Sequence, residues 1–258
     1  MQTPTVQKTQ TMKRQIHLTG RDLMGMVQLR PEDIGKYAIV PGPKERLENL
    51  IKKIENPIKN FTFMEYSMYT GQYAGTRLTA INGGRFSADT AITTELLCNA
   101  QAKCMLRIGS CGALSEEIKI GDLVVVDSAL RGEGVTPYYV AEDFQPATEP
   151  GLTQTVFEVA QNSGCGVHKG RVWSTDAILR ETQEHVGKAI HQGCLAVDMV
   201  SSVFLTIAQL YKIPAAVILA VSDNIITGEM GFLDPNYYMA ESALISVALN
   251  TVKKLEGK

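Results

Sequence analysis

The sequence predicts a single α/β domain in which helices cover both faces of a central mixed, largely parallel sheet, in three layers. Short apolar segments with strand character alternate along the chain with segments of helical character. The length of 258 residues is enough for a substantial core, and no repeat, low-complexity segment or Pro- or Gly-rich linker divides it. We therefore expect one domain over 16–258. Residues 1–15 are polar and lack the apolar run of a signal peptide, so we expect a flexible lead there.

The first half of the chain contains several β candidates and one helix. The apolar segment 36–40 predicts a buried strand that stops at a Pro-Gly-Pro turn. Segments 61–71 and 76–82 are rich in β-formers and are separated by a glycine turn. The segment 87–102 predicts a helix, with Ser87 as its N-cap because serine is favoured at that position.

Three further strands are expected in the middle of the chain. The segment 103–108 predicts a buried strand that ends at Arg107, just before a glycine-rich stretch. Segments 122–130 and 168–175 predict the next two strands.

The last elements alternate in the same way. The segment 151–164 predicts a helix closed by Gly164. The segment 201–211 is apolar on every face, which predicts a buried helix, and 214–223 predicts a buried strand with polar residues at its end. Apolar residues at helical spacing predict a C-terminal helix: Leu244, Val247, Ala248, Thr251, Val252 and Leu255.

Composition excludes several functional classes. With 25 basic and 27 acidic residues the net charge is about −2, so no basic excess favours nucleic acid or an anionic membrane as a partner. No apolar run approaches the roughly 18–20 residues of a membrane span. The five cysteines are odd in number and form no CxxC pair, which favours free thiols in a reducing compartment and a cytoplasmic location. They are Cys98, Cys104, Cys111, Cys165 and Cys194.

Two segments combine glycine with arginine where a strand is expected to end. "VPGPKERL" contains Gly42 and Arg46, and "RIGSCGAL" contains Arg107 and Ser110 between glycines. Glycine lets backbone N–H groups approach an anion, and arginine matches two phosphate oxygens with its planar fork. Since ligands of α/β sheets bind at the carboxyl ends of strands, the two segments predict a phosphate pocket without a Walker loop. A surface ion pair is the alternative reading of either arginine.

These two segments, in this order, resemble the phosphate site of the nucleoside phosphorylase family that holds uridine phosphorylase and the bacterial-type (hexameric) purine nucleoside phosphorylase. The resemblance extends over nearly the whole chain after the lead, through 16–25, 121–140, 170–179, 196–210 and 219–229. It implies a phosphorylase fold and phosphate-dependent cleavage of a nucleoside to a free base and a pentose 1-phosphate.

The resemblance also implies residue roles. Gly42, Arg46, Arg107 and Ser110 match the phosphate binders, and related hydrolases lack these arginines. Asp223 matches the catalytic acid of the purine branch, whereas the uridine branch has no acid there; a helix N-cap is the alternative role for "SDN". Inorganic phosphate is implied as co-substrate. The sequence contains no metal-binding cluster and no dinucleotide fingerprint, so we expect no further cofactor and no metal.

The nucleoside is expected to contact His17, Ile178, Asp198, Met199, Val200 and Ser222. The long insertion that recognises uracil in the uridine branch is absent from 174–196, which favours a purine. The resemblance further implies a homo-oligomer, a dimer or a hexamer, whose sites are shared across a dimer, with His17 reaching a partner's site.

The chain departs from the family near the substrate. Val200 replaces a glutamate that accepts hydrogen bonds from the sugar, a loss of about 1–3 kcal/mol for a hydroxyl left unpaired. Asp198 would be the substitute acceptor. Met64 stands where the family has an arginine that enters a partner's phosphate site, and Arg85 would replace that charge. Ile178 stands where the family has a base-stacking aromatic.

Two classes of function follow. The first is an active phosphorylase, including one for a deoxy or otherwise unusual nucleoside. The second is a catalytically weak or inactive member of the family that serves as a binding or assembly protein. Arg46, Arg107 and Asp223 favour the first, whereas Val200 and Met64 favour the second. A hydrolase is disfavoured by the two arginines.

Overall fold

A computed structural model describes residues 16–257, so the lead expected over 1–15 and Lys258 lie outside the described residues. Within this range ten strands join in one sheet. They are β1 (Tyr37–Pro41), β2 (Glu55–Phe63), β3 (Tyr66–Tyr73), β4 (Thr76–Ile81), β5 (Cys104–Ala113), β6 (Leu123–Gly132), β7 (Val167–Thr175), β8 (Cys194–Asp198), β9 (Ala215–Asn224) and β10 (Glu229–Met230).

The sheet is mixed and partly closed on itself. Its order is β10-β9-β6-β7-β8-β5-β1-β4-β3-β2, and an additional pairing of β9 with β5 closes β5, β9, β6, β7 and β8 into a ring. Strand β1 pairs in parallel with β4 and β5, and β5 pairs in parallel with β9. The remaining parallel ladders join β6 to β7 and β7 to β8, while β2–β3–β4 form an antiparallel meander at the far edge. The predicted single α/β domain with a mixed central sheet is confirmed.

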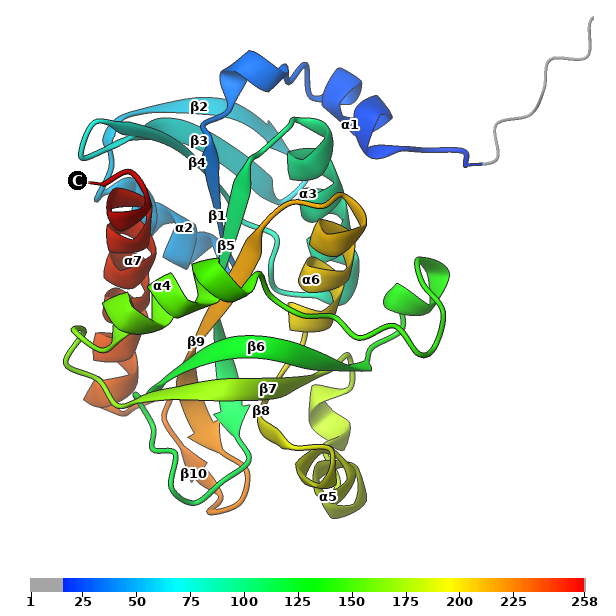
Figure 1. The fold of residues 1–258 in the computed structure, drawn as a ribbon, viewed down its shortest axis with the longest axis vertical. Helices are drawn as coiled ribbons and strands as arrows, with labels where there is room; N and C mark the ends of the chain where they lie inside the picture. The colour runs from blue at the N-terminus through cyan, green and yellow to red at the C-terminus, as the bar shows by residue number, and fades with distance from the viewer. Residues whose placement is uncertain (1–15, 258) are drawn as a thin grey trace, which may run out of the picture.

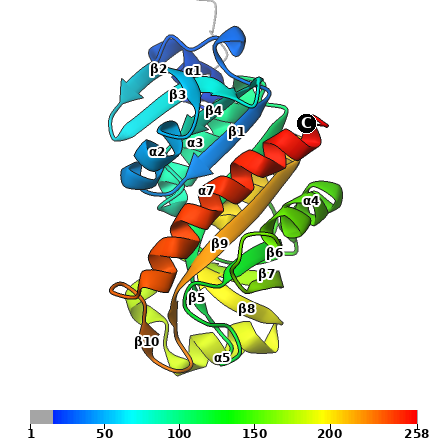
Figure 2. The ribbon, with the colours of Figure 1, turned by 90° about the vertical axis from the view of Figure 1, so that its left-hand side faces the viewer.

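Helices cover the two faces of the sheet (Figures 1 and 2). On one side lie α3 (Ser87–Asn99) and α6 (Ser201–Leu210), with α1 (Gly20–Met26) packed against α3. On the other side lie α2 (Lys44–Ile51), α4 (Pro150–Ala160) and α7 (Pro235–Leu255). Helix α5 (Gln183–His191) packs beside β8, and three short 3₁₀ helices span Pro31–Asp33, Thr136–Tyr138 and Ile178–Arg180.

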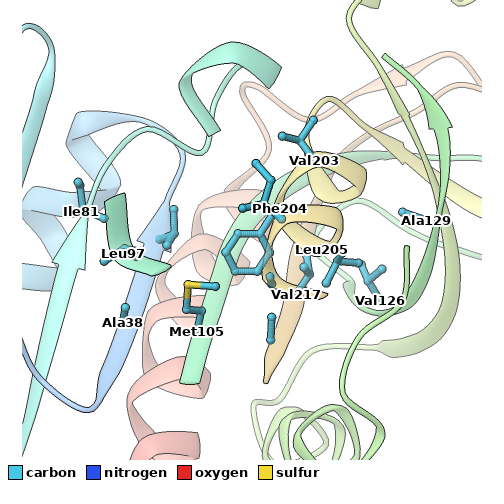
Figure 3. Close-up of a cluster of buried hydrophobic side chains, with 14 of the residues drawn as sticks. Ala38, Ile81, Leu97, Met105, Val126, Ala129, Val203, Phe204, Leu205 and Val217 are labelled. Atoms are coloured by element: carbon cyan, nitrogen blue, oxygen red, sulfur yellow. The ribbon is translucent and has the colours of Figure 1, made fainter. Parts of the chain in front are cut away.

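A cluster of buried apolar side chains lies where α6 meets the sheet (Figure 3). Phe204, Met105 and Val217 are all fully buried there, and Leu97 of α3 packs in the same cluster. Fully burying side chains of this size is worth about 1.5–3 kcal/mol each. The predicted buried helix over 201–211 is confirmed for Ser201 to Ala208, whereas Leu210 and Tyr211 are 45% and 41% exposed at its C-terminal end. This packing holds the strands whose ends form the site described below.

Three local predictions were wrong. Strand β5 does not end at Arg107 but continues to Ala113, because Gly109 and its neighbours go on pairing with β9. Glycine is depleted in strands, so the stretch resembled a turn. The N-cap of α3 is Phe86, since the Ser87 hydroxyl donates instead to Asp176 and to the Met199 carbonyl.

The third concerns the end of α4. This helix ends at Ala160, and Gly164 lies in the turn that follows, where its φ of +84° is a backbone conformation that favours glycine. The glycine therefore shapes the connection to β7 rather than the end of the helix.

Candidate functional site

A cavity of about 390 Å³ lies at the carboxyl ends of β1, β8 and β9 and beside the second half of β5. The loop after β4, the segment after β7 and the loop after β10 complete its wall. Most of the residues predicted from the sequence line it: Gly42, Arg46, Arg107, Ser110, Ile178, Asp198, Met199, Ser222 and Asp223. The fold thus brings together residues that lie up to 181 positions apart in the chain, from Gly42 to Asp223.

Arg107 lies within β5, and its guanidinium crosses the backbone at Gly109. A Cβ at position 109 would come within 2.2 Å of Arg107 Nη1, so only glycine leaves room for the arginine there. The side chain is 4% exposed, and Nη2 donates to the Gly84 carbonyl over 3.2 Å. Its Nε and Nη1 have no hydrogen-bond partner among residues 16–257. A buried guanidinium with two free N–H positions at a cavity is suited to bind an anion.

Asp198 holds Arg107 in place. Its side chain is fully buried, and Oδ2 lies 3.3 Å from Arg107 Nη2. The two carboxylate oxygens also accept hydrogen bonds from the Ser174 hydroxyl and from the backbone and hydroxyl of Ser201. Burial lowers the pKa of Arg107, and the charge of Asp198 opposes that effect. Because its lone pairs are already used, Asp198 is positioned to orient Arg107 rather than to receive sugar hydroxyls.

Arg46 is the second buried cation at the cavity. It lies in the first turn of α2, is 3% exposed, and pairs through Nη2 with Glu241 of α7. Nη1 donates to the Ile108 carbonyl over 3.4 Å, and the Tyr237 hydroxyl donates to Glu241 over 2.8 Å. Arg46 Nε has no partner in the described part of the chain. Glu241 was not singled out from the sequence.

The loop after β4 adds a third cation. Gly84 N donates to the Pro41 carbonyl and Gly83 N to the Gly42 carbonyl, so this loop lies directly against the start of the predicted phosphate segment. Arg85 lines the cavity with an exposed side chain, and its guanidinium lies 5.1 Å from the centre of the Phe86 ring. Arg46 and Arg107 are each neutralised by a carboxylate, whereas Arg85 has no such partner within residues 16–257.

Asp223 lies at the end of β9, across the cavity. Its Oδ1 accepts a hydrogen bond of 2.7 Å from the Ser222 hydroxyl. A Cβ at Gly112 would come within 2.9 Å of Oδ2, so glycine leaves room for the carboxylate. The helix-cap alternative is wrong, because "SDN" is followed by a turn in which Asn224 Oδ1 accepts from the Ile226 and Thr227 backbones.

A second acid on the wall was missed by the sequence analysis. Glu181 follows the 3₁₀ helix after β7 and is half-buried at the cavity. Burial, and then the charge of Asp223, raise the pKa of Glu181 to about 7. Cys111 also lines the cavity, but burial raises the pKa of its thiol well above the ordinary value, so it remains protonated.

Two predicted nucleoside contacts do not reach this cavity. Val200 is the N-cap of α6 and is fully buried in the core, away from the cavity wall. His17 is exposed near the start of the described chain, and it lies outside the cavity of its own protomer. Met64 is 71% exposed at the turn between β2 and β3. The role of His17 at a partner's site stays a prediction.

Residues 36–251 match the family model described as the phosphorylase superfamily. The chain belongs to this superfamily. Three relatives cover most of it. A DeoD-type purine nucleoside phosphorylase from Jannaschia sp. is 29% identical, over 77% of this chain and 86% of its own. A guanosine phosphorylase from Halorubrum lacusprofundi is 26% identical, over 86% and 95%. A uridine phosphorylase from Thermococcus kodakarensis is 27% identical, over 80% and 79%.

Solved structures share the fold of this superfamily member. A uridine phosphorylase from Vibrio fischeri superposes with a TM-score of 0.81 at 23% identity, over 95% of this chain and 100% of that one. A purine nucleoside phosphorylase from Toxoplasma gondii gives the same TM-score and identity, over 89% and 94%. Within the described residues, no group of three or more His, Cys, Asp or Glu side chains is arranged to hold a metal ion. None of the described helices has the length and apolar character needed to cross a membrane.

Proposed function

We propose that this protein is a nucleoside phosphorylase, a pentosyltransferase that cleaves the glycosidic bond of purine nucleosides with inorganic phosphate. The observation that carries the proposal is the pair of buried arginines, Arg46 and Arg107, which line a cavity together with Asp223 and have N–H groups without a hydrogen-bond partner among residues 16–257. Buried N–H donors without a partner cost free energy, and a bound phosphate would satisfy them.

The two ends of the cavity have different roles in this reaction. A phosphate oxygen forms a bond to C1′ of the sugar while the bond from C1′ to N9 of the base breaks, and N9 keeps the electron pair. Arg46, Arg107 and Ser110 orient the nucleophile, and the Asp223 carboxyl group passes a proton to N7, so that the base leaves neutral. The products are a pentose 1-phosphate and the free base.

The relatives support the purine assignment without fixing the base. Two of the three named above are purine or guanosine phosphorylases and one is a uridine phosphorylase. Asp223 favours a purine because only a purine offers a ring nitrogen at N7. We further infer a cytoplasmic homo-oligomer, a dimer or a hexamer, with no cofactor besides phosphate. The exposed His17 and Met64 would then face a partner subunit's site.

The test is base release from ribo- and 2′-deoxynucleosides of adenine, hypoxanthine, guanine and uracil, each with and without phosphate. We expect phosphate-dependent release from purine nucleosides, and the deoxy forms report how the sugar is held in a cavity that Val200 does not reach. Release without phosphate would make the protein a hydrolase and overturn the roles of Arg46 and Arg107. A folded protein that binds phosphate but releases no base would point to the binding or assembly role.

Replacing Arg85 by alanine should raise KM for phosphate roughly tenfold and leave KM for the nucleoside nearly unchanged. The reason is charge balance, since Arg46 and Arg107 are each paired with a carboxylate and Arg85 supplies the remaining positive charge. Steady-state kinetics with varied phosphate measures the effect. Arg30→Ala, at a side chain 75% exposed and outside the cavity, is the matched control. Equal KM values for Arg85→Ala and wild type would remove Arg85 from the phosphate site.

A further inference from the structure

A separate cavity of about 310 Å³ lies between the ends of β6 and β7 and helix α5, and we call it the α5 cavity. Among the described residues, none lines both this cavity and the cavity of the candidate site, called the catalytic cavity below. Within residues 16–257 the wall of the α5 cavity combines the apolar side chains of Leu130 and Ala189 with three basic side chains and no carboxylate. The basic residues are Arg180, His185 and Lys188. An apolar wall with a few convergent polar groups is typical of sites for small molecules.

Two buried side chains of β7 offer hydrogen-bond donors to the α5 cavity. Trp173 is 8% exposed and Thr175 is 4% exposed, and as residues i and i+2 of one strand they lie on the same face. The Trp173 Nε1–H group has no acceptor among residues 16–257. Thr175 Oγ1 accepts from the Ala177 backbone over 3.1 Å, and its own hydrogen has no acceptor in the same part of the chain. Because buried donors are nearly always paired, these two indicate a ligand.

Gly132 leaves space in front of the indole N–H group. A Cβ at this position would lie 2.2 Å from Trp173 Nε1 and 2.8 Å from the Ser174 carbonyl oxygen. Gly132 is exposed at the end of β6, and Thr175 is the residue of β7 that pairs with it. The space over this glycine is therefore open and lies beside both donors, so an oxygen atom of a ligand fits where a side chain would not.

The rim of the α5 cavity is positively charged. Arg180 makes no ion pair with residues 16–257, and Lys188 pairs with Glu184 at an exposed position. The His185 ring lies beside the indole, with 6.5 Å between the ring centres, and its Nδ1 lies 3.1 Å from the Arg180 carbonyl oxygen. An arginine fork and two further donors exceed what the two oxygens of a carboxylate need, whereas they match the three terminal oxygens of a phosphate ester.

We propose that the α5 cavity is a second ligand site, which binds the phosphate group of a small phosphate ester. The phosphate oxygens accept hydrogen bonds from Trp173 Nε1, the Thr175 hydroxyl and the Arg180 guanidinium. The apolar side chains of Leu130 and Ala189 contact the organic part of the ligand. The ligand is bound there and is not converted, and the site exists whether or not the catalytic cavity performs phosphorolysis.

One short segment separates the α5 cavity from the catalytic cavity. Along 177–181, Ala177 and Arg180 line the α5 cavity, whereas Ile178 and Glu181 line the catalytic cavity. A ligand that holds Arg180 therefore also orders the wall that a nucleoside contacts, and a wall ordered in advance lowers the cost of nucleoside binding. This coupling between the two cavities, unlike the site itself, rests on the proposed function.

Trp173 is the one tryptophan of the chain, so its fluorescence reports on the α5 cavity without turnover. Ribose 5-phosphate should change the emission with a saturable dependence on concentration. Arg180→Ala should weaken this binding at least about tenfold, and Arg30→Ala, at a side chain 75% exposed and outside both cavities, should not. Inosine 5′-monophosphate, titrated in parallel, distinguishes a nucleotide from a sugar phosphate as the source of the phosphate group.

Three results would overturn the site. They are no saturable change of emission with either ester, equal affinities in wild type and Arg180→Ala, and binding of inorganic phosphate as tight as that of both esters. Trp173→Phe keeps an aromatic ring and removes the N–H group, so calorimetry should show roughly tenfold weaker binding of ribose 5-phosphate. An unchanged affinity in a folded Trp173→Phe protein would also contradict the role of the indole.

The coupling has a kinetic test. With inorganic phosphate well above its KM, ribose 5-phosphate should lower the KM for inosine by about fivefold in wild type and leave it unchanged in Arg180→Ala. An unchanged KM in wild type, while fluorescence shows the α5 cavity to be filled, would overturn the coupling. If wild type releases no base at all, the proposed function fails, and the fluorescence and calorimetry still decide the site.

Discussion

Replacing Arg107 by glutamine is expected to abolish measurable phosphate binding and to destabilise the fold. The mutation removes the guanidinium of Arg107 from the cavity wall, and it also leaves Asp198 fully buried without its cationic partner. Removing one member of a buried ion pair costs about 3–5 kcal/mol. We expect kcat/KM for phosphorolysis to fall by roughly 10²–10³, the range seen when one preorganised donor to a reacting anion is removed.

A double variant separates these two effects. Arg107→Gln with Asp198→Asn removes both charges, so it should recover most of the lost stability in chemical denaturation while phosphate binding stays lost. The single variant Arg107→Gln then reports the stability cost, and the double variant reports the binding role. Phosphate bound by the double variant with wild-type affinity would show that Arg107 has a structural role only.

The sequence predicts the positions of the phosphate segments well because glycine and arginine constrain each other. Gly109 has no Cβ where the Arg107 guanidinium crosses the strand, and Gly112 leaves room for Asp223. These contacts lie along one strand or between neighbouring strands, so the spacing of glycine and arginine in the sequence still indicates them. The same glycines misled the assignment of β5, since glycine within a strand resembles a turn when nothing shows the pairing with β9.

The partners of these residues could not be predicted in the same way. Glu241 reaches Arg46 from a helix almost two hundred residues later, and helical spacing shows only that it shares a face with Tyr237. Asp198 was expected to replace the missing sugar acceptor, yet its oxygens are occupied by Arg107, Ser174 and Ser201. Such assignments depend on how elements distant in sequence pack together.

Val200 and Glu181 show the same limit of sequence analysis in opposite ways. Val200 stood out because it interrupts a family motif, but the backbone directs it into the core at the start of α6. Glu181 stood in an unremarkable polar segment, and only the fold brings it to Asp223. A motif therefore shows which residue differs from the family. Only the surroundings of that residue in the fold show whether it contacts the substrate.

Replacing Asp223 by asparagine tests the acid directly, and we expect kcat/KM for purine nucleosides to fall by about 10²–10⁴, or roughly 3–5 kcal/mol in the barrier. Asparagine keeps the shape and still accepts the hydrogen bond from the Ser222 hydroxyl, so the fold should be unchanged. The loss should appear in kcat, because proton transfer to the base matters most in the transition state.

The substrate itself provides the control for this prediction. A purine nucleoside methylated at N7 already has a positive charge on the imidazole ring, so its base leaves without receiving a proton. Asp223→Asn should therefore cleave the N7-methylated nucleoside at a rate close to wild type while losing activity on the unmethylated one. Equal losses on both substrates would mean that Asp223 positions the nucleoside rather than protonating it. The proton would then have to come from another acid on the cavity wall, and Glu181, whose pKa is raised to about 7, is the candidate.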